Sequence, residues 1–362
     1  MQRPLVKPEH RPYRLADGTI RIGGCVYGTA GEVEDPTGAV WTLLEAMDGT
    51  RDVEDLVAHV LARHPAEVAD NVSSAVTDLC HSGYVEDAAP ERPGEFADRE
   101  LVRYARGQRF YQWIDLVPRS HPWHAQTRLR AATAAVVGLG GTGSVAALAL
   151  AGSGVGHLHC VDMDAVELSN LNRQALYTED DIGRSKVDAA VARLRLVNSD
   201  IEVTGQHLEV QGPADLAALA DQADVLLLAA DQPPEIRMWT NQACLRQQTP
   251  WVDSGYHGPQ VTATAYVPGE GPCYQCMLTG ARHDEPELWA GDHAGRLGGK
   301  AVSAVSGGLS GHLAAHLVMA LITGAPPVDN GTVYGFNLIA LGHHFALTYP
   351  RRDDCPACGA RP

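Results

Sequence analysis

A glycine-rich stretch of this chain has the spacing to hold the phosphates of a nucleotide. The stretch is VVGLGGTG, from Val136 to Gly143, in which Gly138, Gly140 and Gly143 form a G-x-G-x-x-G pattern. A buried strand that turns sharply into a helix lets phosphates approach the peptide N–H groups at the helix N-terminus. Enzymes of hydride transfer and of adenylyl transfer both use this device, so the pattern predicts a nucleotide site without deciding the chemistry.

Polar residues downstream favour a triphosphate that is about to be attacked. Asp162 ends the next predicted strand, 19 residues after Gly143, where an acidic residue hydrogen-bonds ribose hydroxyls. The segments DMDAVELSNLNRQ and GRSK then supply Asn170, Arg173 and Lys186. A nicotinamide enzyme leaves its pyrophosphate intact and holds it mostly through backbone amides. Two cations suit a leaving pyrophosphate better, because each such contact typically contributes ~3–4 kcal/mol to the transition state.

Asp231 ends a third predicted strand, in LLLAADQ, and we expect it to face the same crevice. Mg²⁺ is usually held by one or two carboxylates together with substrate phosphates. The alternative is a helix N-cap for the segment that follows, because Asp is favoured there. We interpret Asp231 as a magnesium or nucleotide contact.

Two C-x-x-C pairs predict a structural zinc site. They are Cys273 with Cys276 and Cys355 with Cys358. In a reducing compartment such pairs indicate metal ligands rather than disulfides. Four thiolates satisfy tetrahedral Zn²⁺ in a closed, structural site, which can contribute ~10–16 kcal/mol to folding. A redox role for either pair is the alternative.

Strand and helix patterns alternate from about residue 131. The predicted strands are 132–139, 157–164 and 224–231, and the predicted helices are 142–153, 184–197 and 234–247. Residues 250–268 and 331–349 have the pattern of further strands, separated by a long helix near 300–323. The alternation predicts an α/β, Rossmann-like fold with a parallel sheet and helices on both faces.

Residues 18–87 have the pattern of a separate small domain. Two short strand-like pieces precede three helical stripes, and Asp52 is placed to cap the second helix. The segment GYVED returns as a strand, so the arrangement predicts a winged helix. The polar connector AAPERPGEFADRE marks the boundary between domains 1–90 and 91–362.

Composition limits the partners. The formal net charge of −16 argues against general nucleic-acid binding, which depends on clustered Lys and Arg. No apolar run reaches ~18 residues, and the N-terminus lacks a signal-peptide pattern. We therefore expect a cytoplasmic protein without a nucleic-acid or membrane partner.

The ordered set GLGGTG, DMDAVELSNLNRQ, GRSK, AAD, CYQC and CPAC resembles the ThiF/MoeB superfamily, the bacterial relatives of ubiquitin-activating enzymes, over about residues 100–359. The upstream RYARGQ, from Arg103, is similar to that family's RYxRQ motif. In this family a carboxylate attacks the α-phosphate of ATP, pyrophosphate leaves and an acyl-adenylate remains. Members are typically homodimers in which the second arginine of RYxRQ, here Arg106, reaches into the neighbour's site.

The resemblance assigns roles to particular residues. It implies catalytic roles for Arg106, Arg173, Lys186 and Asp231, the last as a ligand of Mg²⁺. It implies nucleotide contacts from Gly138, Gly140, Gly141, Gly143, Asp162, Asp164, Asn170, Arg173, Gln174 and Lys186. It implies that the nucleotide is ATP or another nucleoside triphosphate.

Two departures from the family pattern matter. The usual Asp-Asn at the third strand end is Asp231-Gln232 here. The crossover segment MLTGARHDEPELWAGDHAGRLGGK contains no cysteine, although thioester-forming relatives carry their nucleophilic thiolate in this region. The unpaired cysteines, which lie in predicted strands or helices and are interpreted as buried small residues, are Cys25, Cys80, Cys160 and Cys244. We expect adenylation without an enzyme-bound thioester.

The N-terminal pattern resembles PqqD-like peptide-recognition domains, which bind the leader of a ribosomally made precursor peptide as an added strand. A DNA-binding winged helix is a weaker interpretation, because a basic face is lacking. The fusion resembles maturases of microcin C7-type and pantocin-type peptide natural products. We expect ATP-dependent adenylation of a carboxylate on such a peptide. The alternatives are a sulfur-carrier-protein adenylyltransferase, a non-catalytic leader-presenting scaffold and, remotely, a nicotinamide dehydrogenase, which leaves SNLNRQ and GRSK unexplained.

Some further residues have two interpretations. His312 and His316 have metal-binding i, i+4 spacing, but no Glu follows His312, which favours a packed helix. WVDSGYHGP places Ser254, Tyr256 and His257 after a strand that should end near the crevice, where they could line a substrate pocket. The glycine-rich loop 291–299 is either a mobile cover or a solvated connector.

Overall fold

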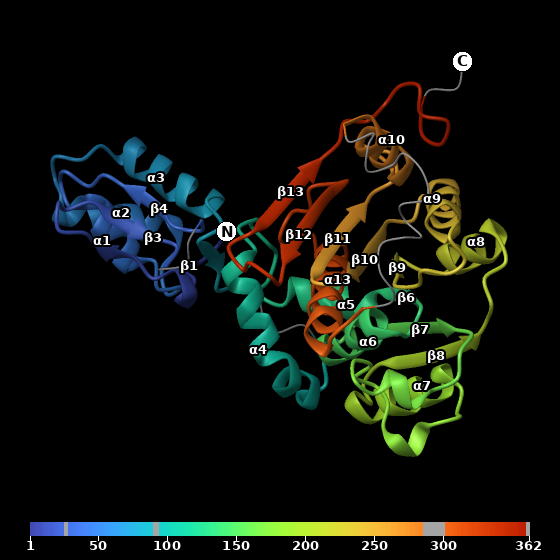
Figure 1. The fold of residues 1–362 in the computed structure, drawn as a ribbon. Helices are drawn as coiled ribbons and strands as arrows, with labels where there is room; N and C mark the ends of the chain where they lie inside the picture. The colour runs from blue at the N-terminus through green and yellow to red at the C-terminus, as the bar shows by residue number, and fades with distance from the viewer. Residues whose placement is uncertain (25–27, 90–93, 285–300, 360–362) are drawn as a thin grey trace. The chain divides into compact units, whose positions relative to one another are not determined.

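The chain divides into two compact units, Met1–Thr127 and Arg128–Pro362, in a computed structural model (Figure 1). The structure describes residues 1–24, 28–89, 94–284 and 301–359.

The second unit is built on one eight-stranded sheet. In spatial order its strands are β13 (His344–Thr348), β12 (Thr332–Asn337), β11 (Gln260–Tyr266), β10 (Trp251–His257), β9 (Val225–Leu228), β6 (Thr133–Val137), β7 (His157–Asp162) and β8 (Glu202–His207). The strands from β10 to β8 are parallel, and this half confirms the predicted α/β alternation.

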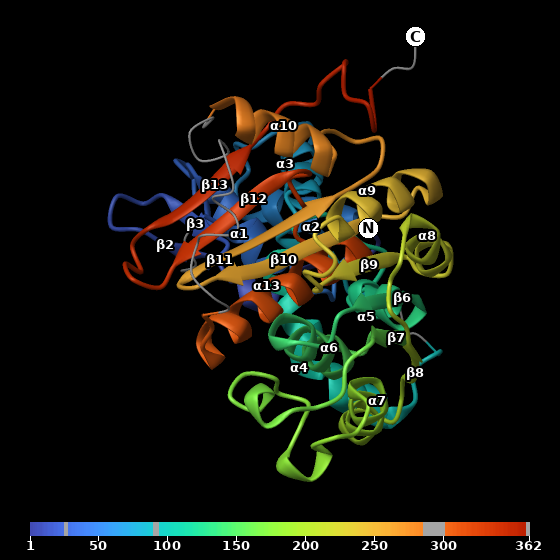
Figure 2. The same cartoon turned by 45° about the vertical axis from the view of Figure 1, so that its right-hand side comes forward.

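The other half of the sheet is antiparallel, which the alternation did not predict (Figure 2). Residues 250–268 form a hairpin of β10 and β11, with His257 paired to Gln260 across a two-residue turn. Gly258 in this turn has φ of +57°, a left-handed conformation that glycine adopts at no steric cost. The sheet is therefore mixed rather than wholly parallel.

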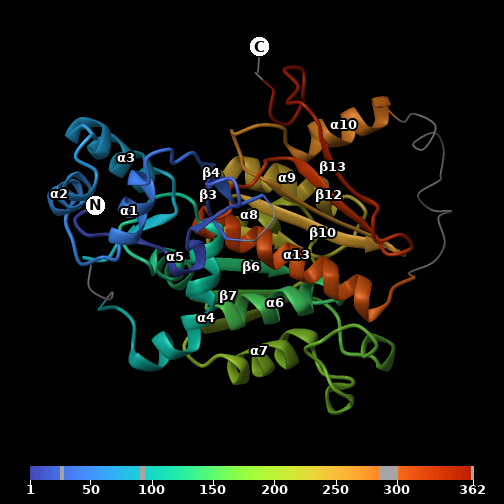
Figure 3. The same ribbon diagram turned by 90° about the vertical axis from the view of Figure 1, so that its left-hand side faces the viewer.

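Helices cover both faces of the sheet, as predicted. The helices of this unit, with α5 at the division between the units, are α5 (His124–Ala131), α6 (Gly141–Ser153), α7 (Lys186–Val197), α8 (Pro213–Asp221), α9 (Ile236–Gln247), α10 (Tyr274–Asp284) and α13 (Ala304–Thr323), with short 3-10 turns η2 (Leu168–Asn170) and η3 (Glu179–Asp181). Residues of α8 and α9 share a buried cluster with Trp251 of β10. On the opposite face α13 packs against α6, β10 and β11 (Figure 3).

Helix α13 is long and apolar enough, by length and composition alone, to cross a membrane. Within its most apolar window of 18 residues, 56% of the window is buried inside the protein. A core helix passes the same test, so this is weak evidence for a membrane span.

In the described residues up to Asp115, the first unit holds four helices and two small sheets. The helices are α1 (Ala39–Ala46), α2 (Val53–Arg63), α3 (Ala69–His81) and α4 (Asp98–Ile114), and η1 (Pro8–His10) is a 3-10 turn. One sheet pairs β1 (Pro4–Val6) with β5 (Val85–Asp87), and the other has the order β2 (Tyr13–Arg14), β3 (Ile20–Ile22), β4 (Gly31–Val33). The predicted cap of α2 is confirmed, because the Asp52 carboxylate accepts a hydrogen bond from Asp55 N at 2.8 Å.

Helix α4 belongs to this first unit through buried hydrogen bonds. Lys7 Nζ donates to Asp115 O at 2.7 Å, just after α4, and a ring nitrogen of His10 lies 2.9 Å from Gln112 O. The compact unit thus extends past the polar connector. The domain boundary near residue 90 and the winged-helix interpretation stay predictions.

Candidate nucleotide and zinc sites

The candidate nucleotide site lies where the order of the parallel strands reverses. From β6 the chain moves to β7 and β8 on one side and then returns to β9 and β10 on the other. In open α/β sheets, ligands bind in the crevice outside the carboxyl ends of the strands at this point. The glycine loop follows β6, and Asp231 follows β9.

The glycines of the loop are required by its geometry. Gly138 has φ of +94°, and a Cβ there would lie 2.8 Å from the backbone of Ala229. A Cβ on Gly143 would lie 1.7 Å from Gly138 O, so α6 can approach the turn only with glycine at this position. Gly140 is the N-cap of α6 and no side-chain cap is formed there, so the first N–H groups of the helix have no intrahelical partner.

Asp162 ties the loop to the end of β7. Its Oδ2 accepts from Leu139 N at 2.6 Å, and its Oδ1 accepts from Asp164 N at 2.8 Å. The residue is only 9% exposed. Its position at the strand end is the one predicted for a ribose contact, and it additionally fixes the loop.

The chain between Asp164 and Lys186 folds back on itself and brings Lys186 to the same strand end. Its Nζ donates to Asp164 Oδ2 at 2.7 Å and lies 4.0 Å from Asp162 Oδ1. Its backbone N donates to Asp164 O at 2.9 Å, next to a β-bridge between Ala165 and Ser185. The structure therefore gathers the predicted Asp162, Asp164 and Lys186 into one cluster.

Asn170, Arg173 and Gln174 lie on η2 and the turn after it. Asn170 Oδ1 accepts from Glu167 N at 3.0 Å, which gives this buried amide a local capping role. Arg173 is anchored by its donation to Ser169 O at 2.8 Å.

Gln174 is buried beside the glycine loop. Its Nε2 lies 3.9 Å from the position of a Cβ on Gly140. Its Oε1 is buried and has no hydrogen-bond partner in the described part of the chain. A buried polar atom of this kind is costly unless a ligand or water pairs with it. The donor set around the loop therefore fits a nucleotide.

Asp231 is exposed, three residues after the end of β9. Its carboxylate makes no hydrogen bond within the described ranges, so it is available to a cation. Arg237 of α9 lies close enough for Asp231 to add to the rise in its pKa, although the main cause is Asp253, whose Oδ2 is 3.0 Å from Arg237 Nε. Sequence patterns did not single out the pair of Arg237 and Asp253.

Arg106 is exposed on α4 in the first unit, and its contact with a neighbour's site stays a prediction.

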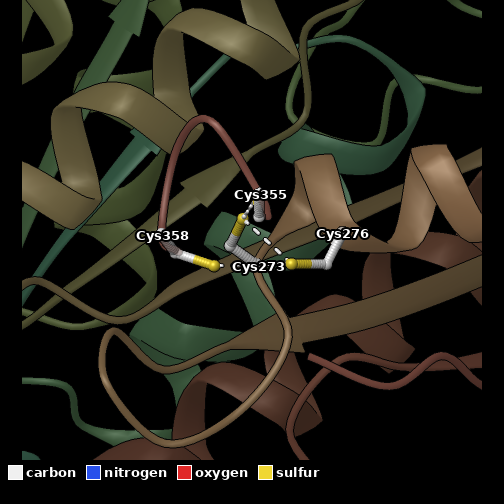
Figure 4. Close-up of side chains that lie close together, drawn as sticks. All are labelled: Cys273, Cys276, Cys355 and Cys358. Carbon is white, nitrogen blue, oxygen red and sulfur yellow. Dashed lines mark hydrogen bonds between the residues drawn. The ribbon is translucent and has the colours of Figure 1, made fainter. Parts of the chain in front are cut away.

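The four paired cysteines meet in the second unit (Figure 4). Their sulfur atoms all lie within 4.8 Å of one another. Cys273 Sγ is 3.9 Å from Cys276 Sγ and 3.8 Å from Cys355 Sγ, and Cys276 Sγ is 3.4 Å from Cys358 Sγ. A tetrahedron of sulfurs ~2.3 Å from zinc has edges of about 3.8 Å, so the cluster fits Zn²⁺ in a closed site.

Asn241 of α9 supports the first cysteine pair, although the sequence did not indicate it. Its Nδ2 lies 3.7 Å from Cys273 Sγ, and its Oδ1 accepts from Tyr274 N at 3.0 Å. Contacts of this kind orient metal ligands.

Burial makes the described unpaired cysteines poor nucleophiles, as expected. It raises the pKa of Cys160 and of Cys244 to about 12, and it also raises the pKa of Cys80. Such thiols stay protonated near neutral pH. Cys25, the loop 291–299 and much of the crossover segment lie outside the described residues.

The other ambiguous side chains take different positions. Ser254 is buried, and its Oγ lies 2.9 Å from both Thr262 O and Ser310 O, so it has a packing role. Tyr256 lies against Gly141, and His257 is exposed in the hairpin. On α13, His312 is exposed, whereas burial lowers the pKa of His316. Neither histidine belongs to a metal-binding group among the described residues.

These features define a Rossmann-like nucleotide-binding protein with a four-cysteine site. The model of the ThiF family matches residues 115–357, and the chain belongs to that family. Residues 1–114 lie outside the match.

Similar proteins agree with this placement. Adenylyltransferase and sulfurtransferase MOCS3 of Culex quinquefasciatus is 34% identical over 269 residues, which are 73% of this chain and 57% of that protein. The chain thus spans a little over half the length of that relative. Protein HesA, vegetative, of Trichormus variabilis is 36% identical over 65% of this chain and 83% of that one. The crystal structure of E. coli MccB has a TM-score of 0.80 at 22% identity, and covers 100% of this chain and 98% of that one; this likeness concerns the fold.

Proposed function

We propose that this protein adenylates a carboxylate on a ribosomally made precursor peptide, with ATP as the nucleotide and without an enzyme thioester. The observation that carries the proposal is the order of groups along the carboxyl edge of the sheet. Asp162 and Lys186 lie at β7, the glycine loop follows β6, and Asp231 follows β9. This order suits a nucleotide whose ribose lies at β7 and whose phosphates extend towards β9.

The proposed reaction is a displacement at the α-phosphorus. A carboxylate oxygen of the peptide forms a bond to that phosphorus, the bond from phosphorus to the bridging oxygen breaks, and pyrophosphate leaves with the electron pair. Arg173, Lys186 and, from a second copy, Arg106 stabilise the charge on the phosphates. Asp231 would hold Mg²⁺, which neutralises phosphate charge when bound. The N–H groups at the start of α6 provide further donors.

The peptide substrate is supported by similarity in fold. Solved structures of E. coli MccB include complexes with ATP, and with AMPCPP and MccA, and the second aligns over 99% of this chain with a TM-score of 0.75. In our proposal the leader docks on residues 1–90 as an added strand of a winged helix, and the chain acts as a homodimer in the cytoplasm. The carboxylate that it activates is C-terminal or in a side chain.

A second candidate function is adenylation of a sulfur-carrier protein. It is favoured by the relatives of higher sequence identity, among them MOCS3, whose name includes adenylyltransferase and sulfurtransferase. The catalytic edge would be the same, since both substrates present a carboxylate. The substrate would instead be a folded carrier, and residues 1–90 would not contribute to its recognition.

Pyrophosphate–ATP exchange tests the proposal. The probe is a synthetic peptide encoded by a short reading frame beside this gene, and a folded sulfur-carrier protein is tested in parallel. We expect exchange that requires the peptide and falls about 10²–10³-fold in Lys186→Ala. Arg193→Ala is the matched control and should retain exchange: Arg193 is a half-buried residue of the same helix α7, and its guanidinium lies 3.8 Å from Asp181 Oδ2.

The outcomes separate the candidates. Exchange with the carrier alone would replace the peptide proposal by the second function. Tight binding of the peptide without exchange would refute adenylation of that peptide and favour the leader-presenting scaffold.

A further inference from the structure

Tyr256 lies at the start of helix α6, beside the glycine loop. A Cβ built on Gly141, the first residue of α6, would lie 2.9 Å from Tyr256 Oη and 3.4 Å from Cε1. The tyrosine thus occupies the space that any larger residue at position 141 would need. Its hydroxyl makes no hydrogen bond among the residues that the structure describes, and the side chain is half-buried.

The backbone that carries Tyr256 is held firmly. Tyr256 pairs with Val261 next to the tight turn of the β10–β11 hairpin. Two residues earlier on the same face, Ser254 contacts Ser310 of α13. Thr142 Oγ1 of α6 lies 2.7 Å from Ser310 Oγ, so β10, α13 and α6 are joined at one point. The backbone of Tyr256 is therefore held in place relative to α6.

The approach of Tyr256 indicates which part of a bound substrate it meets. The ribose end of the site is at β7, and the glycine loop follows β6. β10 lies beyond β9 on the other side of β6, opposite β7. Tyr256 therefore reaches the start of α6 from the side away from the ribose, so a bound group that it meets there is not the ribose.

The loop itself carries an independent sign of a ligand. Gln174 is 4% exposed, and its buried Oε1 has no hydrogen-bond partner among the described residues, while its Nε2 lies 3.9 Å from the position of a Cβ on Gly140. A free hydroxyl and an unpaired amide thus flank the same helix start. Both are groups that a bound molecule would satisfy.

We propose that Tyr256 is a catalytic residue whose hydroxyl donates a hydrogen bond to the carboxylate of the incoming substrate at the start of α6. The inference rests on the proposed adenylation and adds the residue that orients the attacking group. An O–H donor suits this place, because the carboxylate oxygen is anionic and the N–H groups of α6 serve the phosphates.

Tyr256→Phe is the test, because it removes the hydroxyl and retains the ring against Gly141. Tyr334→Phe is the matched control. The hydroxyl of Tyr334, on β12, lies 3.1 Å from the exposed Asp329 carboxylate. We expect Tyr256→Phe to lower kcat/KM for the peptide in pyrophosphate exchange by roughly 10- to 100-fold, as for loss of a hydrogen bond to a charged group. The Kd for ATP, measured without peptide, should change less than about 3-fold, and Tyr334→Phe should leave both values unchanged.

Each contrary result has a distinct meaning. Active wild-type protein with unchanged kcat/KM in Tyr256→Phe would overturn this inference and leave the proposed function intact. A loss fully explained by weaker ATP binding would move the hydroxyl to a nucleotide phosphate and also overturn it. An inactive wild-type protein would refute the proposed function itself.

Discussion

Substitution of Gly143 by alanine should destabilise the glycine loop by more than helix propensity can offset. The new Cβ would lie 1.7 Å from Gly138 O, whereas real Cβ contacts stay above 3.0 Å, so the backbone must separate by at least 1.3 Å (3.0 minus 1.7). Both atoms belong to the backbone or are fixed to it, so no side-chain rotation relieves the clash. Overpacking of this kind typically costs ~1–3 kcal/mol. Alanine returns at most ~1 kcal/mol through helix propensity.

Gly152, in the same helix α6, provides the matched control. A Cβ there would meet nothing within 4 Å. Gly152→Ala should therefore be neutral or stabilise the protein by up to ~1 kcal/mol, which is about 2–4 °C in Tm for a unit of this size. Thermal unfolding would measure both variants, and ATP titration would show whether the displaced loop has lost affinity.

Gly143→Ala is expected to lower the stability of the protein, whereas Gly152→Ala is expected to leave it unchanged or raise it. If Gly143→Ala unfolded at the wild-type temperature and bound ATP as tightly, the close contact between α6 and the turn would be wrong. If both variants were destabilised equally, the effect would belong to the helix as a whole.

Two further predictions concern the zinc site and the acid limb of stability. The purified protein should contain zinc, measured by elemental analysis. Cys355→Ser should lose the zinc, and its free energy of unfolding should fall by ~2.7–4.1 kcal/mol where free zinc is 100–1,000 times its Kd. Cys80→Ser is the control and should retain the zinc. Burial alone would raise the pKa of Asp181, but hydrogen bonds from Thr178 and the nearby Arg184 guanidinium lower it. A lowered folded-state pKa contributes stability above the ordinary Asp value of about 4, and that contribution is lost as pH falls through the folded pKa. The free energy of unfolding should therefore fall less steeply at acid pH in Asp181→Asn than in the wild type. The same dependence on acid pH in both proteins would contradict this.

The parallel half of the sheet could be predicted because its signals are local. The glycine loop directly follows β6, Asp162 ends β7, and Asp231 comes three residues after β9, and a helix pattern follows each of these strands along the chain. The hairpin of β10 and β11 gave no such signal, since a tight turn at Gly258 interrupts an apolar pattern without ending it. Strands β11 and β13 therefore run antiparallel to the strands that precede them, although the sequence showed only further strand pattern there.

The residue types of the candidate site could be predicted from the sequence, whereas many contacts between these residues could not. Asp162, Asp164 and Lys186 were predicted as nucleotide contacts, but the hydrogen bond between Asp164 and Lys186 joins residues 22 positions apart in the chain. Asn241 lies 32 positions from the cysteine that it contacts. Such pairs depend on tertiary packing, and no periodicity in a single sequence encodes them.

Chemistry and substrate choice are carried by different parts of the chain. The ThiF family match spans residues 115–357, so the nucleotide loop, the cluster around Lys186 and three of the four cysteines lie within it, and Cys358 directly follows its last residue. A carboxylate on a peptide and a carboxylate on a carrier protein are equivalent to that machinery, because each reacts at the same phosphorus. Discrimination between them must come from groups that contact the rest of the substrate. The first unit, whose elements largely precede the match, is where we expect those groups. For this reason a substitution in α6 should affect any carboxylate substrate, whereas a substitution on β2, β3 or β4 should affect only a peptide that docks there.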